Sequence, residues 1–506
     1  MPVVPPTPEE LAELAARHGF RLGEADRKSF AGLVEANLAA HEAVERLYTR
    51  SAPSAPHRDY EWPEDNPLGA WYVRTRITPT GDGPLSGREV VIKDNIAVAG
   101  VPMMNGSRAV EGFVPRRDAT VVSRVLAAGG TIVGKAVCED LCYSGSSFTS
   151  ASGPVRNPWD PTRHAGGSSS GNAALLAAGE ADFAIGGDQG GSVRMPAAFC
   201  GVVGHKPTHG LVPYTGAFPI ETTIDHLGPM TRTVRDAALL LSVLAGDDGF
   251  DPRQFRTPEP PDYLAAVEQD IRGVRVGVLT EGFGLPMSEP GVDDAVRAAA
   301  DRLAAAGAVV SEVSVPWHRD GLDVWTVIGT DGTARQMIDG NGYGMNVPGR
   351  YDPELMVHFA QGRRVHADDM SDTLKTMILT GAYAAERYDM RHYAMARELA
   401  WELRAGYDAA LTEVDVLVLP TVPYVAKPLP GPDATREERM VNALGMVGNT
   451  APFDASGHPA ISVPAAPVDG LPTGLMIAGR RFDDAMCLRV AAAYEREVGG
   501  FPVAAR

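Results

Sequence analysis

Lysine is scarce in this sequence, and signals that mark several other protein classes are missing. Six lysines occur among 506 residues: Lys28, Lys93, Lys135, Lys206, Lys375 and Lys427. The formal net charge is −18, and no run of Lys and Arg is present to attract a nucleic acid or an anionic membrane. No apolar run is long enough to cross a membrane, and the N-terminus lacks the basic and apolar segments of a signal peptide. We therefore expect a cytoplasmic protein with neither a nucleic-acid nor a membrane partner.

Cysteine is also rare. The four cysteines, Cys138, Cys142, Cys200 and Cys487, are too few to cross-link a chain of this length and indicate reduced thiols in a reducing compartment. Cys138 and Cys142 have helical spacing, but a metal site needs further ligands at a suitable distance, and none is nearby. We interpret these cysteines as packing residues and expect no metal and no other cofactor.

The first 66 residues have a helical pattern. Thr7-Pro8-Glu9-Glu10 has the order of a capping box with a first-turn proline, which predicts a helix start. An apolar stripe at helical spacing continues through Phe30, Leu33, Val34, Leu38, Val44 and Leu47. We predict that residues 1–66 form an N-terminal helical unit that serves as a dimerisation surface in a homodimer.

The rest of the chain has the pattern of an α/β fold. Short β-branched runs alternate with Ala-rich amphipathic segments, which predicts a mixed, largely parallel central sheet sandwiched by helices. We expect a catalytic core in residues 67–330, a helical insertion in residues 331–411 and the remainder of the core in residues 412–506. Strands are predicted at residues 90–92, 131–133, 181–185, 274–279, 309–315, 416–419, 459–464 and 475–477. Helices are predicted at residues 118–128, with Asp118 as the cap, and at residues 171–178 and 293–306.

Two Gly/Ser clusters, at residues 166–171 and 188–194, are the most informative motifs. Dense glycine implies that the backbone itself approaches another group. The second cluster follows a predicted strand, and the backbone N–H groups of Gln189, Gly190 and Gly191 could converge as an oxyanion hole. Ser192 ends this loop, in the position of a nucleophile that attacks a carbonyl.

A serine nucleophile needs a base, and the residues alone leave its identity open. None of the twelve histidines stands in a recognisable motif. Residues 167–171 match G-x-S-x-G, with Ser169 as the nucleophile, but no strand is predicted before them. Lys93 ends an apolar strand, and burial favours the neutral form of an amine. The alternative for Lys93 is an ion pair with Asp94.

Together these motifs resemble the amidase signature family. The resemblance rests on Val91-Ile92-Lys93-Asp94-Asn95, on residues 166–171 and on Gly190-Gly191-Ser192-Val193-Arg194, in this order, and it covers residues 85–485. It implies that Ser192 is the nucleophile, that Ser168, held by a cis peptide after Gly167, relays the proton, and that Lys93 is the final base. Such enzymes cleave carboxylic amides through an acyl-enzyme.

Within the family, Gln189 replaces the commoner Thr, and the chain is most similar to broad-specificity, enantioselective bacterial amidases of the Rhodococcus type. That likeness implies a homodimer that acts on aliphatic and aromatic amides, with Tyr143 and Val447 lining the acyl pocket. Two alternatives remain open. The same triad could act mainly on carbamate, anilide or ester bonds, or the chain could be an amidotransferase A-type subunit.

Overall fold

The computed structural model describes residues 3–345 and 347–504 and divides the chain into two compact units, residues 1–55 and 56–506. The smaller unit holds helices α1 (Pro8–Arg17) and α2 (Glu24–Ser51), which contact each other. The predicted capping box is confirmed, because Thr7 Oγ1 accepts from Glu10 N–H and the Glu10 carboxylate accepts from Thr7 N–H. Residues 60–61, placed in the N-terminal unit by sequence, form a strand that pairs within the larger unit.

The larger unit is built on a mixed sheet, as the sequence predicts. In the described residues it has twelve strands, in the order β1-β2-β4-β3-β7-β9-β8-β13-β14-β12-β10-β11. Two groups of parallel strands, β4-β3-β7 and β12-β10-β11, are joined by antiparallel pairs. The strands are β1 (Tyr60–Glu61), β2 (Trp71–Ile77), β3 (Glu89–Lys93), β4 (Thr131–Ala136), β7 (Phe183–Asp188), β8 (Val203–Lys206), β9 (His226–Thr231), β10 (Arg275–Leu279), β11 (Val309–Val313), β12 (Val416–Pro420), β13 (Ala460–Pro464) and β14 (Gly474–Gly479).

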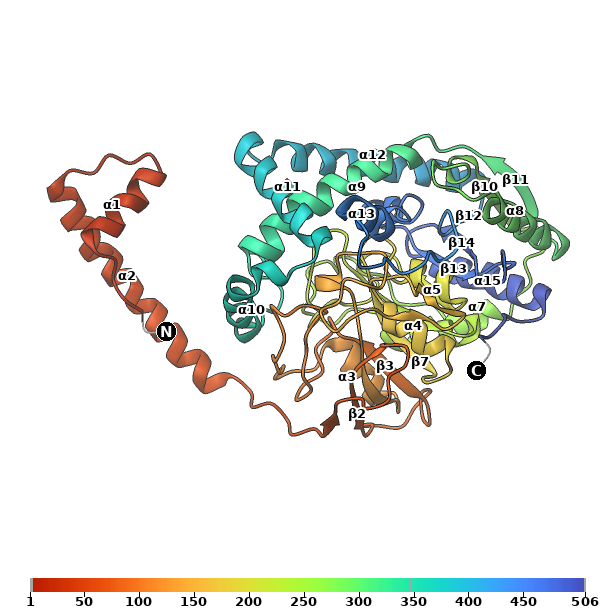
Figure 1. Ribbon diagram of the computed structural model, residues 1–506, viewed down its shortest axis with the longest axis horizontal. Coiled ribbons are helices and arrows are strands. Elements are labelled where there is room, and N and C mark those ends of the chain that lie inside the picture. Colours follow the sequence, from red (N-terminus) through yellow and green to blue (C-terminus); the bar gives the residue numbers. More distant parts are fainter. Residues whose placement is uncertain (1–2, 346, 505–506) are drawn as a thin grey trace. The chain divides into compact units, whose positions relative to one another are not determined.

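Helices flank this sheet (Figure 1). One group packs on the strands and on each other: α3 (Thr120–Ala127), α6 (Val234–Leu244), α7 (Tyr263–Val267), α8 (Pro290–Ala305) and α15 (Asp484–Val498). A second group comprises α4 (Ser170–Ala177) and α5 (Arg194–Cys200), which contact each other and the central strands. Every residue of α4 and α5 is buried, because neither helix has a polar face to present to water. Each of these helices follows one of the two Gly/Ser clusters, so both clusters lie inside the protein.

The remaining elements are further α-helices and short helical turns. Figure 1 shows α9, α11 and α12 close together, and these helices contact one another. The elements are η1 (Asp140–Cys142), η2 (Thr280–Gly282), α9 (Trp317–Thr333), η3 (Ala334–Asp339), α10 (Pro353–Val365), η4 (Ala367–Asp369), α11 (Asp372–Tyr388), α12 (Arg391–Glu413), α13 (Arg436–Leu444) and α14 (Ala451–Ser456). Most of the described residues between 331 and 411 lie in helices; that they form a helical insertion and a separate small domain stays a prediction.

Two local expectations are wrong. Asp118 does not cap α3; its carboxylate accepts from the N–H of Ala99 and pairs with Arg58. The second expectation is that no strand precedes residues 167–171. In the structure, β6 (Asp160–His164) precedes them and pairs with β5 (Arg156–Asn157) in a separate two-stranded sheet. For Asp118, a partner 60 residues away outweighs the local signal.

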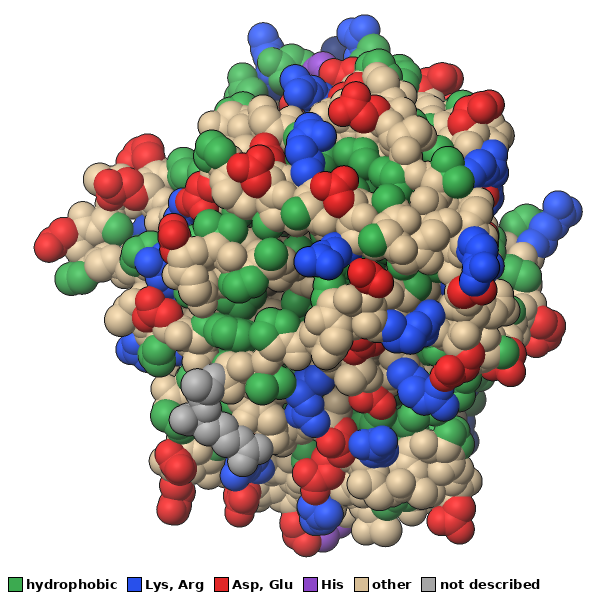
Figure 2. Space-filling view, turned by 90° about the vertical axis from the view of Figure 1, so that its right-hand side faces the viewer, with side chains coloured by type: hydrophobic (Ala, Val, Ile, Leu, Met, Phe, Trp, Pro, Cys, Tyr) green, Lys and Arg blue, Asp and Glu red, His purple; other side chains and the backbone are tan. Residues whose placement is uncertain are grey.

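The surface has mixed charge on the face shown in Figure 2, where Lys and Arg side chains are interspersed with Asp and Glu side chains. None of the described helices is both long enough and apolar enough to pass through a membrane.

Candidate active site

Lys93 is the last residue of β3, and its side chain is fully buried. Its Nζ donates to Ser168 Oγ at 2.7 Å and to the carbonyl oxygen of Gly187 at 3.1 Å. The alternative ion pair with Asp94 is not formed, because Asp94 pairs with Lys135 of the neighbouring strand β4 at 2.8 Å. Among the residues that the structure describes, no carboxylate therefore competes with the Ser168 hydroxyl for Lys93.

Ser168 lies in the first Gly/Ser cluster and is also fully buried. The Gly167–Ser168 peptide is cis. The Gly167 N–H donates to the carbonyl oxygen of Gly145 at 2.8 Å, and the Ser168 carbonyl accepts from Glu139 N–H at 3.2 Å. A Cβ on Gly167 would collide with the carbonyl oxygen of Ser146, so only glycine fits. Close backbone packing therefore fixes Ser168 beside Lys93.

The second cluster is held by the buried carboxylate of Asp188. It accepts from the N–H groups of Gly191 at 2.7 Å and Val193 at 2.9 Å, and it pairs with the Arg194 guanidinium at 2.9 Å. Burial alone would raise the pKa of Asp188, but the charge of Arg194 outweighs burial and holds this pKa well below its usual range. The carboxylate thus stays ionised and folds the loop around itself, which leaves Ser192 at the tip.

Two residues from distant parts of the chain orient the peptide planes of this loop. Trp325 Nε1 donates to the Gln189 carbonyl at 2.6 Å, and Thr450 Oγ1 donates to the Gly190 carbonyl at 2.6 Å. In a trans peptide the N–H points opposite to the C=O. The Gly190 N–H therefore points away from Trp325, and the Gly191 N–H points away from Thr450, toward Asp188.

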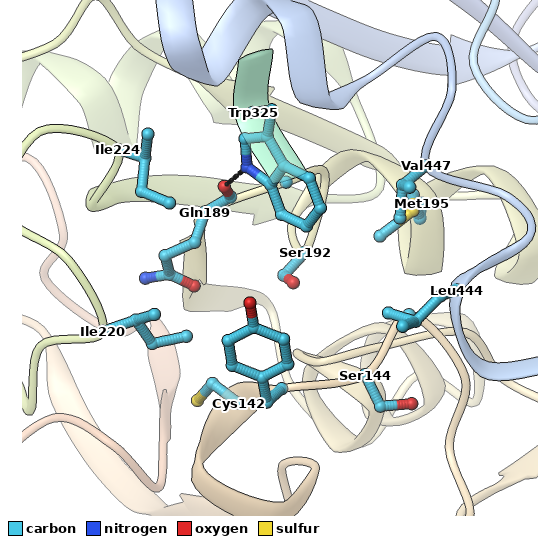
Figure 3. A pocket seen from close by; sticks show the side chains of 13 residues that line it. Cys142, Ser144, Gln189, Ser192, Met195, Ile220, Ile224, Trp325, Leu444 and Val447 are labelled. Carbon is cyan, nitrogen blue, oxygen red and sulfur yellow. Dashed lines mark hydrogen bonds between the residues drawn. The ribbon is translucent and has the colours of Figure 1, made fainter. Parts of the chain in front are cut away.

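Ser192 lines a cavity, which we call the central cavity (Figure 3). In this view Ser192 lies in the middle, with Trp325 above it, Ile220 and Ile224 on one side, and Val447 and Leu444 on the other. The residues that line the central cavity are Cys142, Tyr143, Ser144, Gly145, Gln189, Gly190, Ser192, Met195, Ile220, Ile224, Trp325, Leu444 and Val447. Most of the wall is apolar, so the central cavity suits an apolar group attached to a carbonyl.

The structure brings the residues singled out from the sequence into one region. Tyr143 and Val447 line the central cavity together with Ser192, Gln189 and Gly190. Lys93 and Ser168 are joined by their hydrogen bond, and the Ser169 N–H donates to the Ser192 carbonyl oxygen at 3.2 Å, which links the two Gly/Ser clusters. Ser169, the serine of the G-x-S-x-G alternative, is fully buried, and its Oγ donates to the carbonyl of Gly187 at 3.2 Å. Its hydroxyl is therefore turned toward β7 and engaged there.

Sequence reasoning did not identify Trp325, Thr450, Ile220 or Ile224. All four lie outside the Gly/Ser clusters, in segments whose pattern predicts only a helix or a loop. Ile220 and Ile224 have helical spacing but lie in a loop. No local signal in the sequence could have located these residues.

Cys142 also lines the central cavity, and its thiol has an unusual setting. The Sγ atoms of Cys138 and Cys142 donate to Asn105 Oδ1 at 3.5 and 3.3 Å. Burial tends to raise the pKa of Cys142, but hydrogen bonding with Cys138 and the charge that Lys93 carries when protonated outweigh it and bring the pKa to about 7. Within the described part of the chain, no three His, Cys, Asp or Glu side chains are arranged to hold a metal ion.

Comparison with known proteins identifies the family of this chain. The family model described as Amidase matches residues 70–488. An enantioselective amidase from Rhodococcus rhodochrous is 54% identical over 507 residues, which cover 99% of this chain and 97% of that protein. The A-type subunit of glutamyl-tRNA(Gln) amidotransferase from Exiguobacterium sibiricum is 39% identical, over 83% of this chain and 85% of that protein. The solved structure of native peptide amidase from Stenotrophomonas maltophilia has a TM-score of 0.70 and 31% identity, and the match covers 84% of this chain and 85% of that one.

Proposed function

Because this chain belongs to the amidase family and is an amidase, we propose that it cleaves carboxylic amides through an acyl-enzyme on Ser192. Ser192 Oγ attacks the carbonyl carbon while its proton passes to Ser168, and the Ser168 proton passes to the amine of Lys93. The tetrahedral intermediate collapses, and the leaving amine receives the proton back through Ser168. Water then attacks the ester, and the same relay releases the acid.

The observation that carries this proposal is the buried hydrogen bond of 2.7 Å between Lys93 Nζ and Ser168 Oγ. Among the described residues no carboxylate pairs with Lys93, so its amine contacts the Ser168 hydroxyl and the Gly187 carbonyl oxygen. The serine that it contacts then has a base within direct reach. General-base assistance of this kind contributes about 10² to 10⁴ in rate.

We assign stabilisation of the oxyanion to the loop of Gln189, Gly190 and Gly191. The Gly191 N–H already binds Asp188, so the N–H groups of Gln189 and Gly190 are the remaining donors. Trp325 supports this assignment because it holds the Gln189 carbonyl and so turns the Gly190 N–H away from itself. A donor fixed in advance costs no reorganisation, and losing one lowers the rate by about 10² to 10³.

The proposed substrates are amides with apolar aliphatic or aromatic acyl groups. The wall of Ile220, Ile224, Leu444 and Val447 supports this choice, since burying apolar surface is favourable at about 25 cal/mol per Å². Carbamates, anilides and esters rank behind amides because the same acyl-enzyme route accepts other leaving groups. The R. rhodochrous relative, which matches nearly the whole chain, favours an amidase over an amidotransferase component.

An active-site-directed fluorophosphonate tests the nucleophile. We expect one adduct, on Ser192, and loss of amide hydrolysis in proportion to labelling. Ser192→Ala should neither label nor turn over amide, whereas Ser169→Ala should still label at Ser192. An adduct on Ser169 in the unmodified protein would refute the proposed nucleophile.

The chain is further proposed to form a homodimer in the cytoplasm. The described residues of α2 include none that is buried, and the predicted apolar stripe includes Phe30, Leu33, Val44 and Leu47, all exposed. An exposed apolar stripe of this kind is typical of a protein–protein interface. Sedimentation of the full chain should give a dimer, and Leu33→Glu combined with Val44→Glu should give a monomer; a dimeric double variant would exclude this surface. The four free, buried cysteines support a reducing compartment.

A further inference from the structure

Tyr143 has a buried hydroxyl that the proposed reaction does not use. Its ring packs in an apolar cluster with Ile220, Phe218 and Met337, and only 5% of the residue is exposed. The structure gives Tyr143 Oη no hydrogen-bond partner among the described residues. The buried hydroxyls of tyrosines are usually paired, so this one is an exception that calls for a ligand.

The hydroxyl faces one stripe of α9. Trp325, Gly329 and Thr333 follow each other at intervals of four residues, so their side chains share a helix face. A Cβ on Gly329 would lie 3.1 Å from Tyr143 Oη, so the absence of a side chain there makes room for the hydroxyl. Thr333 Oγ1 is buried and also has no partner among the described residues. Trp325 is different, because its N–H is already bound to Gln189.

We propose that the Tyr143 hydroxyl is a specificity-determining group that binds an oxygen substituent on the acyl part of the substrate. Amides whose acyl group carries a hydroxyl or ether oxygen are then preferred over apolar amides of the same shape. This inference rests on the proposed function, since it assumes that the acyl group occupies the central cavity.

The chemistry of the wall explains why an oxygen is favoured. Apolar side chains line most of the central cavity. They select an acyl group by its shape, but they cannot form a hydrogen bond to a polar atom on it. Burial raises the pKa of Tyr143, and a hydrogen bond that the neighbouring Thr333 hydroxyl can donate to the phenol oxygen offsets only part of that rise, so the phenol's own proton is still without an acceptor among the described residues. The phenol therefore stays protonated at neutral pH and remains a donor. An apolar substrate leaves this donor unpaired, whereas an oxygen-bearing substrate satisfies it.

Hydroxybenzamides and the corresponding methylbenzamides test the proposal, because hydroxyl and methyl groups have similar size. We would measure kcat/KM for the ortho, meta and para pairs with the unmodified protein and with Tyr143→Phe. The unmodified protein should prefer the hydroxyl compound at one or more ring positions. Tyr143→Phe should lower that hydroxyl-to-methyl ratio by about tenfold, the value of one hydrogen bond. Its melting temperature should stay equal or rise, because an unpaired buried hydroxyl is removed.

Tyr214→Phe is the matched control. The Tyr214 hydroxyl is buried but paired, accepting from Gln189 Nε2 at 2.8 Å and donating to the Phe218 carbonyl at 3.2 Å, so its loss should change both members of each pair alike. An unchanged ratio in Tyr143→Phe at all three ring positions would overturn the proposal. So would a lower melting temperature with an unchanged ratio, which would mean that Tyr143 and Thr333 pair only with each other. Failure of the unmodified protein to hydrolyse any of these amides, or full activity in Ser192→Ala, would instead refute the proposed function.

Discussion

Replacing Lys93 with Met separates the proposed base from a merely structural lysine. Methionine has nearly the shape of the lysine stem and removes only the amine. Without Nζ, Ser168 loses its proton acceptor and Gly187 loses a donor to its carbonyl. We expect amide turnover to fall by about 10² to 10⁴, which corresponds to roughly 3–5 kcal/mol of activation free energy. Unfolding free energy should fall by no more than about 1–3 kcal/mol, the cost of leaving buried polar atoms unpaired.

Lys135→Met is the matched control, because Lys135 is equally buried on the adjacent strand β4 and stands opposite Ile92 in the pairing of β3 with β4. Its partner is the carboxylate of Asp94. Removing one member of a buried ion pair costs about 3–5 kcal/mol, so this variant should lose more stability than Lys93→Met and keep more activity per folded molecule.

The control also has a pH signature. Burial raises the pKa of Asp94, and Lys135 lowers it. With Lys135 gone, the folded-state pKa of Asp94 rises further above its unfolded value. A raised pKa of this kind adds stability at low pH, which is lost as the pH rises through the folded-state value. Lys135→Met should therefore be less destabilised at about pH 5 than at about pH 8.

Steady-state hydrolysis of a simple amide, with urea unfolding of the same samples, measures both effects. Turnover by Lys93→Met above a tenth of the original rate would remove Lys93 from the proton relay. If a folded Lys135→Met protein loses as much turnover as Lys93→Met, then activity depends on the packing of β3 and β4 and not on the Lys93 amine.

Two further predictions concern buried ionisable groups. The pKa of about 7 at Cys142 predicts that iodoacetamide inactivates the protein at a rate that rises as the pH passes through this value, and that a competing amide slows it. Cys200, whose pKa burial raises, should stay unmodified, and peptide mapping that finds Cys200 labelled first would contradict this. Burial, with the charges of Lys427 and Arg163, lowers the pKa of His164 from 6.5 to about 3. Because the folded-state value lies below the unfolded one, the contribution of His164 to stability is complete above about pH 6.5 and declines as the pH falls toward 3, by about 1.4 kcal/mol per unit. In urea unfolding between about pH 6.5 and pH 4, His164→Gln should lose stability less steeply than the unmodified protein, and equal slopes would disprove the assignment.

The parts of the fold that could be predicted from sequence depend on local signals. The capping box at Thr7 and the run before Lys93 mark a helix and a strand because propensity and periodicity act over a few neighbours. Asp118 shows the limit. It stands where a cap would, but Arg58 and the Ala99 N–H bind its carboxylate instead. A local preference worth about 1 kcal/mol gives way to partners from another segment.

In the candidate site, one loop contains both features that the local sequence reveals and features that distant residues determine. The glycines and Ser192 could be recognised because the chemistry is concentrated in consecutive residues. Its geometry could not, since the two side chains that fix the peptide planes come from 136 and 260 residues away. Trp325 contributes twice, through its N–H to the Gln189 carbonyl and through its ring to the wall of the central cavity. Trp325 therefore both limits the shape of the acyl group and orients the Gly190 N–H as the proposed oxyanion donor. Substrate fit and oxyanion geometry are thus physically coupled, and this coupling exists only in the folded chain.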